Sequence, residues 1–90
     1  MTIDTTKSVY PYIVSFHDQF DLICIAEDKF CVRKTVKGWF GKSVYFASMT
    51  GGYEDQLREM KSPSEFEIGN REKATFVFNL HTLETKCPRV

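Results

Sequence analysis

The chain has 90 residues, of which 42% are hydrophobic and 27% are charged. This length predicts one domain over residues 1–90 with a small core, and it excludes two domains. Twelve basic side chains balance twelve acidic ones, so binding to nucleic acid or to an anionic membrane would need a local patch. The apolar content excludes a disordered chain, and no apolar run approaches the roughly 20 residues that span a bilayer.

The start of the chain and its cysteines indicate the compartment. Residues 1–8 are polar and lack the basic start of a secretory signal. Cys24, Cys31 and Cys87 form no CxxC pair and no metal-binding spacing with histidine. We expect reduced thiols, a cytoplasmic protein, no cofactor, no bound metal and no membrane contact.

Four strands are predicted before residue 51. Residues 8–16 are rich in aromatic and β-branched side chains, and Pro11 confines this run to an outer strand because proline donates no hydrogen bond to a ladder. Residues 20–26 and 30–36 are two more β-rich runs with a polar break between them, which predicts a hairpin. A loop with two glycines then leads to residues 43–50, which predicts a second hairpin.

The turn between the second and third runs sets their register. A two-residue turn at residues 27–28 pairs Asp21 with Lys34 and Cys24 with Cys31, so the two thiols are predicted to be neighbours. Glu-Asp is not the Asn-Gly sequence that a type I′ turn prefers. A longer loop with a shifted register is therefore an alternative, and whether the two thiols ever form a disulfide stays open.

The segment after the glycine pair at residues 51–52 has a helical pattern. Tyr53, Leu57 and Met60 fall at i, i+4 and i+7, the spacing of one helix face. Pro63 follows three residues later and predicts the end of a short helix.

Two last strands are predicted at residues 66–68 and 74–83. A five-residue loop between them sets Phe66 opposite Phe76, and alternation places Phe76 and Phe78 on one face. The whole order is four strands, one helix and two strands. It predicts an α+β domain with a mainly antiparallel, strongly bent sheet or small open barrel of about six strands and one short helix.

The glycine-bracketed loop is the most informative segment for function. It carries Trp39 and Phe40 side by side, and large rigid aromatic side chains at a loop tip are typical anchors of an interface. The alternative is that both rings fold back and close one end of the sheet.

Basic residues surround this loop and extend along the preceding strand. Together with the two aromatic residues they form our candidate partner-binding set: Lys29, Arg33, Lys34, Lys37, Trp39, Phe40 and Lys42. Such a strip would suit an acidic protein, or a phosphate backbone whose bases stack on the rings. The alternative is a solvated sheet face whose charges are balanced within the chain, because Asp21 is predicted to face Lys34.

Two fragments here resemble the signature by which RNA-recognition-motif domains stack bases on a central strand. The fragments are Lys37-Gly38-Trp39 and, after a gap, Val44-Tyr45-Phe46. Phe40 and Gly41 stand in the opposite order to that signature, and the predicted strand order lacks the family's first helix. We therefore do not assign the chain to this family.

Catalytic interpretations are weaker. Cys24 or Cys31 beside His17 would form a Cys–His nucleophile pair, but cysteines within strands more often pack as small hydrophobic side chains. Glu65 and Glu67 belong to an acidic cluster that is typical of a solvated face. We predict that the protein is not an enzyme.

The sequence thus predicts a small binding protein that modulates or inhibits a partner macromolecule, most directly a protein. Short aromatic-rich domains of this kind are typical of bacteriophages and mobile elements, as host-directed inhibitors or antitoxins. Two alternatives stay open. One is a single-stranded RNA- or DNA-binding module, and the other is a structural or adaptor protein that self-associates through an exposed strand edge.

Overall fold

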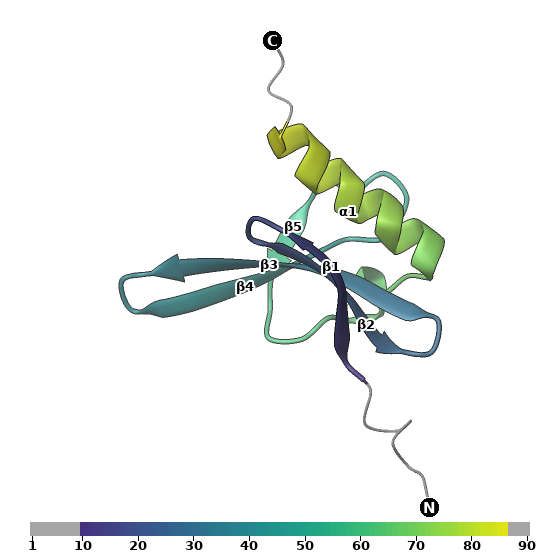
Figure 1. Cartoon of the computed structure of the whole chain (residues 1–90), viewed down its shortest axis with the longest axis horizontal. Coiled ribbons are helices and arrows are strands. Elements are labelled where there is room, and N and C mark those ends of the chain that lie inside the picture. Colours follow the sequence, from purple (N-terminus) through teal and green to yellow (C-terminus); the bar gives the residue numbers. More distant parts are fainter. Residues whose placement is uncertain (1–9, 87–90) are drawn as a thin grey trace, which may run out of the picture.

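The computed structural model describes residues 10–86 and consists of an antiparallel sheet with one long helix across it (Figure 1). In chain order the elements are β1 (Tyr12–His17), β2 (Phe20–Ala26), β3 (Lys29–Gly38), β4 (Gly41–Ala47), β5 (Leu57–Glu59), the 3-10 turn η2 (Glu65–Glu67) and α1 (Arg71–Lys86). Within the described residues, no helix has both the length and the apolar character needed to cross a membrane.

The five strands lie side by side in chain order, and each neighbouring pair is antiparallel. The predicted α+β class with a bent, open sheet is confirmed, with five strands instead of six and with the helix last. β1 is an edge strand as predicted, and it begins directly after Pro11. The first residues of the predicted run and Cys87 lie outside the described residues.

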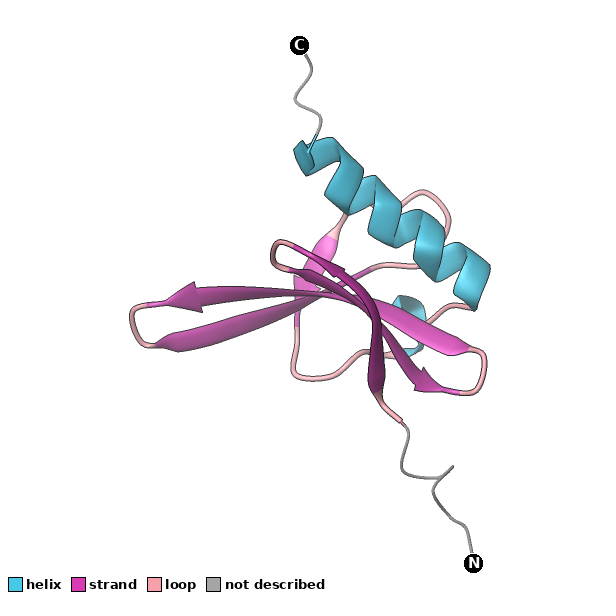
Figure 2. Ribbon diagram, viewed as in Figure 1, coloured by secondary structure: helices cyan, strands magenta, loops and turns pink. Residues whose placement is uncertain are grey.

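α1 packs on one face of the sheet, against β2 and β3 (Figure 2). Ala74, Val77 and Phe78 follow one another at helical spacing and are buried. They join a main core whose other members come from the strands and from the segment just after β4: Phe20, Leu22, Cys24, Phe30, Val32, Ala47 and Met49. Burial of this helix face holds α1 on the sheet.

The opposite face of the sheet holds a smaller buried cluster. Its members are Ile23, Cys31 and Phe46, and Met60 from the segment after β5 packs against them. The same segment returns to the sheet at Gly69, which exchanges backbone hydrogen bonds of 2.8 and 2.9 Å with Phe30. The chain between β5 and α1 is thereby fastened to the sheet at both ends.

The predicted C-terminal strand pair, residues 66–68 and 74–83, is wrong, because the first run contributes to η2 and the second lies within α1. The helix begins after Asn70, whose side-chain oxygen accepts the backbone N–H three residues later at 2.8 Å, as an N-cap residue does. Phe78 is 8% exposed and Phe76 is 55% exposed, so they do not share a face. Burial of a helical stripe outweighs the weak strand preference of the aromatic and β-branched side chains.

The short helix predicted from Tyr53, Leu57 and Met60 is also wrong. Turns follow the glycine pair, and β5 then pairs with β4, with Leu57 opposite Ala47. A helix of about ten residues is marginal by itself, whereas the edge of β4 offers partners for the backbone N–H and C=O groups of this segment. Leu57 packs against the main core from a strand.

The predicted hairpin between β2 and β3 forms with a register that differs by one residue. Leu22 lies opposite Val32, and Cys24 lies opposite Phe30 instead of Cys31. The register shifts by one residue between Cys24 and Ala26, so that Ala26 lies opposite Lys29 and the turn keeps two residues. A shift of one residue exchanges cross-strand partners, and here it places Cys24 in the main core and Cys31 in the cluster on the other face. The two thiols are therefore not cross-strand partners, and they lie on opposite faces of the sheet.

Candidate interaction surface at the hairpin tip

β3 and β4 form a hairpin that stays paired to its end. Lys37 lies opposite Lys42 and Gly38 opposite Gly41, which leaves Trp39 and Phe40 as a two-residue turn. Gly41 has a φ of +136°, a backbone conformation that side chains with a Cβ rarely adopt. Gly41 thus permits a turn so tight that both aromatic residues occupy its tip.

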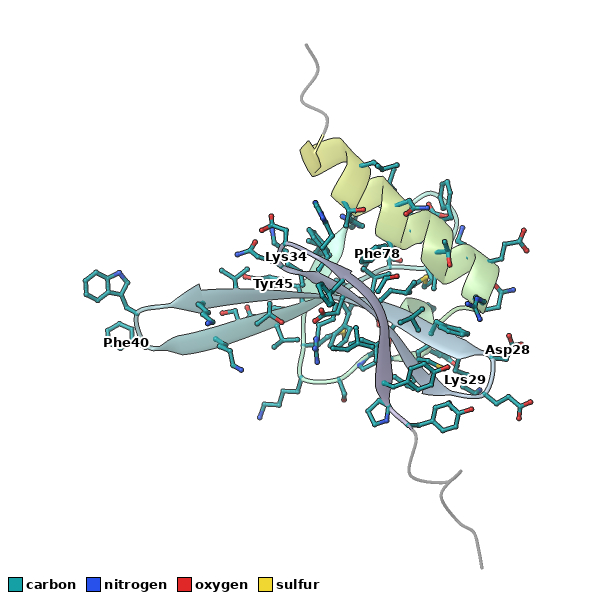
Figure 3. All side chains as sticks on the ribbon, viewed as in Figure 1. Asp28, Lys29, Lys34, Phe40, Tyr45 and Phe78 are labelled. Atoms are coloured by element: carbon teal, nitrogen blue, oxygen red, sulfur yellow. The ribbon has the colours of Figure 1, made fainter. Side chains whose placement is uncertain are left out.

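Both aromatic side chains of the tip are in solvent. Trp39 is 96% exposed and Phe40 is 103% exposed, and the label in Figure 3 marks Phe40 at the far end of the hairpin. Neither ring closes the end of the sheet, so this alternative is excluded. Two large aromatic rings side by side form a contiguous apolar surface, the kind of exposure that is typical of interaction sites.

The outer half of the hairpin has no neighbouring strand. β2 pairs with β3 only as far as Lys34, and β5 pairs with β4 only from Tyr45 inward. One more backbone hydrogen bond follows on each strand, from Thr35 N–H to the Gln19 carbonyl and from Met60 N–H to the Val44 carbonyl. From there to the turn β3 and β4 pair only with each other, and they extend away from the helix (Figure 1). The tip is therefore accessible to a partner from several directions.

Two lysines stand at the base of the tip. Lys37 and Lys42 are directly opposite each other across the hairpin, so they lie on the same face of the sheet, the face without the helix. Both are exposed, and in residues 10–86 neither has an ion pair. Like charges directly opposite each other in a sheet are unfavourable, and a negatively charged partner would relieve this repulsion.

The other basic residues of the predicted set lie in different surroundings. Arg33 donates a hydrogen bond to the Asp21 carboxylate at 2.8 Å, so Asp21 is paired with Arg33 and not with Lys34 as predicted. The Lys34 ammonium lies 5.4 Å from the centre of the Phe20 ring, on the face of the main core. Lys29 lies at the opposite end of β3 from Phe40 (Figure 3).

Four of the seven predicted binding residues therefore come together, namely Lys37, Trp39, Phe40 and Lys42. We call these four residues the hairpin tip. Strand alternation separates Lys34 from this group, and the ten-residue length of β3 separates Lys29 from it. The basic residues of β3 are thus divided between the two faces of the sheet and the two ends of the strand, and they do not form one strip.

The Cys–His pairs considered from the sequence do not form. His17 lies opposite Phe20, whereas Cys24 lies near the other end of β1, opposite Tyr12. Burial raises the pKa of the Cys31 thiol to about 11, which is the opposite of what a nucleophilic thiolate requires. No group of three or more metal-ligating side chains is present in the part of the chain that the structure describes.

One predicted solvated residue is buried. Glu67 has no exposed surface, and its carboxylate accepts the Ser64 N–H at 3.0 Å and the Ser64 hydroxyl, while Arg58 lies 3.4 Å away. The sequence Ser-x-x-Glu at 64–67 is the signal for this capping box. The acidic cluster at η2 is thus partly structural and does not form one solvated face.

Comparison of the chain with models of protein families, with curated proteins and with solved structures found no match. The topology also separates the chain from the RNA-recognition motif, since five strands in chain order precede the only helix of eight or more residues in the described region. Trp39 lies in a turn and not on the face of a central strand.

Proposed function

We propose that this is a non-enzymatic binding protein that modulates or inhibits a partner macromolecule by inserting the hairpin tip into a pocket or cleft of that partner. The observation that carries the proposal is the exposure of Trp39 and Phe40, 96% and 103%, at the end of a protruding hairpin. A folded protein that presents two such rings without packing them has an apolar anchor available for an interface.

The tip suits an anchor energetically. Tryptophan and phenylalanine bring large contact areas and have few rotatable bonds to immobilise, and tryptophan is enriched among residues that dominate binding energy. The ladder between β3 and β4 extends to Gly38 and Gly41, so the turn is held before binding and little backbone order has to be gained. Lys37 and Lys42 favour a partner pocket with an acidic rim.

Single-stranded RNA or DNA is the second candidate partner. The specific observation in its favour is that two aromatic rings and two lysines without ion pairs are within one tip. Bases stack on exposed rings without sequence preference, and each ammonium neutralises a phosphate. A protein partner is the first proposal because two lysines neutralise only two phosphates, which contributes little affinity for a nucleic-acid backbone.

We place the protein in the cytoplasm. Cys24 and Cys31 are free thiols buried on opposite faces of the sheet. Free thiols of this kind suit a reducing compartment.

The experiment is quantitative capture of partners from a bacterial lysate by the wild-type protein and by Trp39→Ala with Phe40→Ala. The matched control is Tyr53→Ala, which removes another exposed aromatic side chain, 56% exposed, from a different loop. We expect the tip variant to lose at least about 30-fold in affinity for the captured partner, because a single anchor of about 2 kcal/mol already gives that factor. The control should retain full affinity.

Trp39 is the only tryptophan of the chain, so its fluorescence reports directly on the tip. A purified protein partner should shift its emission to the blue as the indole leaves water. An oligonucleotide that quenches Trp39, with an affinity that falls as salt rises, would instead support the second candidate. A captured partner that binds the tip variant and the wild type equally, with unchanged Trp39 emission, would contradict the proposal.

A further inference from the structure

The two edges of the sheet differ in length and in charge. β5, at one edge, has three residues and includes Arg58 and Glu59. β1, at the other edge, has six residues and contains no Asp, Glu, Lys or Arg. Proteins usually protect a free strand edge with lysine or proline, with a short or bulged strand, or with a covering element. Pro11 precedes β1 and a register shift lies within the strand, but no Lys, Arg, Asp or Glu of β1 guards the edge and no described element covers it. In the described region β1 pairs only with β2, and its outer side is unpaired (Figure 1).

An irregularity in β1 brings two apolar side chains to the same face. Ile13 lies opposite Ile23, and Phe16 lies opposite Asp21, with the register shift between Ile13 and Ser15. Ile23 and Asp21 are two residues apart on β2 and therefore point to one side of the sheet. Without the extra residue in β1, Ile13 and Phe16 would point to opposite sides.

These two side chains are exposed beside a buried apolar cluster. Ile13 is 51% exposed and Phe16 is 73% exposed. Their face is the one without α1, because Ile23 belongs to the smaller cluster with Cys31 and Phe46. Ile13, opposite Ile23, extends the apolar surface of this cluster to the free edge, and Phe16 lies on the same face opposite Asp21. Neither side chain has a cover among the described residues.

We propose that a second copy of this chain pairs its own β1 with this edge, antiparallel, to form a two-fold dimer with a continuous sheet. When the strand is aligned antiparallel with itself about the midpoint between Val14 and Ser15, Ile13 of each copy lies opposite Phe16 of the other. All four side chains then lie on one face. The inference does not depend on the hairpin tip.

The charge pattern supports a second copy as the occupant. An identical strand would repeat any charge of β1 close to itself, and β1 has no carboxylate, ammonium or guanidinium group to repel. Its one imidazole, on His17, lies opposite Tyr12 of the other copy in this alignment and not opposite itself. The pairing also uses the same edge of both copies, so it closes at two chains and leaves no β1 edge for a third.

The test measures molar mass by light scattering over a wide range of protein concentration. The wild type should rise from the 10.5 kDa of one chain to twice that mass, without larger species. Phe16→Lys should weaken the dimer at least about 100-fold, because each substitution acts twice at a two-fold interface and adds a pair of like charges. The matched control is Leu83→Lys on α1, which alters a side chain that is 54% exposed away from β1 and should leave the dimer constant unchanged.

Hydrogen exchange of the wild type provides a second measurement that does not depend on a folded variant. Backbone amides of β1 should gain protection as the concentration rises, and amides of β5 should not. Three outcomes would overturn the proposal: a monomer at every concentration, a dimer lost in Leu83→Lys but kept in Phe16→Lys, or β1 amides whose exchange does not depend on concentration. Protection of β1 by an extended peptide from another protein, with the free protein monomeric, would identify a different occupant.

Discussion

Arg58 Nη1 on β5 lies 3.4 Å from Oε2 of Glu67, a carboxylate with no exposed surface, although Arg58 itself is 58% exposed. The pair connects the edge strand to the 3-10 turn before α1. A buried carboxylate needs hydrogen bonds and a counter-charge, and here Ser64 supplies the hydrogen bonds and Arg58 supplies the charge.

Removal of either member of this pair should destabilise the fold unequally. Glu67→Ala leaves a cavity and breaks the cap, and we expect a loss of about 3–5 kcal/mol in the free energy of unfolding from the two effects together. Arg58→Met keeps the hydrogen bonds from Ser64, and we expect about 1–3 kcal/mol. Urea titration measures both. A larger loss for Arg58→Met than for Glu67→Ala would contradict this ordering.

The two faces of α1 give a direct test of the helix. Phe78→Ala should cost about 3–5 kcal/mol because it empties a site in the main core. Phe76→Ala should change stability by about 0.5 kcal/mol or less, since more than half of that side chain is in solvent. The strand predicted from the sequence placed Phe76 and Phe78 on one face, so it would have given equal losses of stability for the two variants. Thermal unfolding distinguishes the two arrangements.

The pKa of Cys31 makes stability fall at alkaline pH. Burial raises it from 9.0 to about 11, so between these values the unfolded chain loses the proton while the folded chain keeps it. Stability from this group is complete below pH 9.0 and falls as pH rises toward about 11, by a total on the order of 2–3 kcal/mol. The free energy of unfolding should fall less between pH 8 and 10 in Cys31→Val than in the wild type. Equal slopes of this free energy against pH in the two proteins would contradict the role of Cys31.

Glu54 gives the opposite pH dependence. A hydrogen bond from the Lys73 ammonium holds the pKa of its carboxyl below the ordinary value. The resulting stabilisation is present above the ordinary pKa and is lost as pH falls through the lowered value. Thermal midpoints of the wild type and Glu54→Gln should therefore differ at neutral pH and converge in acid. The matched control is Glu59→Gln, which removes an exposed carboxylate without an ion pair among the described residues.

Reversal of one charge in the hairpin tip should affect stability and binding in opposite directions. Lys42→Glu creates an opposite-charge pair with Lys37 across the hairpin and should stabilise the fold by about 0.2–1 kcal/mol. The same change should weaken binding to an acidic partner and make it less sensitive to salt. Lys29→Glu, at the other end of β3, is the control and should leave binding unchanged. A loss of stability in Lys42→Glu would show that the two lysines do not repel each other.

The hairpins were predictable because their signals are local. Polar turn residues between β-rich runs place β1 to β4 correctly, and Gly38 and Gly41 mark the loop that holds Trp39 and Phe40. The register of β2 and β3 is the shifted one that the Glu-Asp turn had left open, and the shift comes from one irregular residue after Cys24 and not from a longer loop.

The C-terminal half depends on contacts between distant segments. Residues 74–80 satisfy both a two-residue and a helical period, and only the apolar surface offered by β2 and β3 favours the helix. Asn70 was the available local signal, as an N-cap before a charged first turn.

The sequence by itself determined the class of fold, the two hairpins and the aromatic pair at a glycine-bracketed turn, because these follow from the preferences of neighbouring residues. Only the tertiary structure decided which charges meet. It paired Arg33 with Asp21, placed Lys34 over Phe20 and left Lys37 and Lys42 without ion pairs in the described region. Strand register and alternation assign each side chain to a face, and a shift of one residue changes those assignments together.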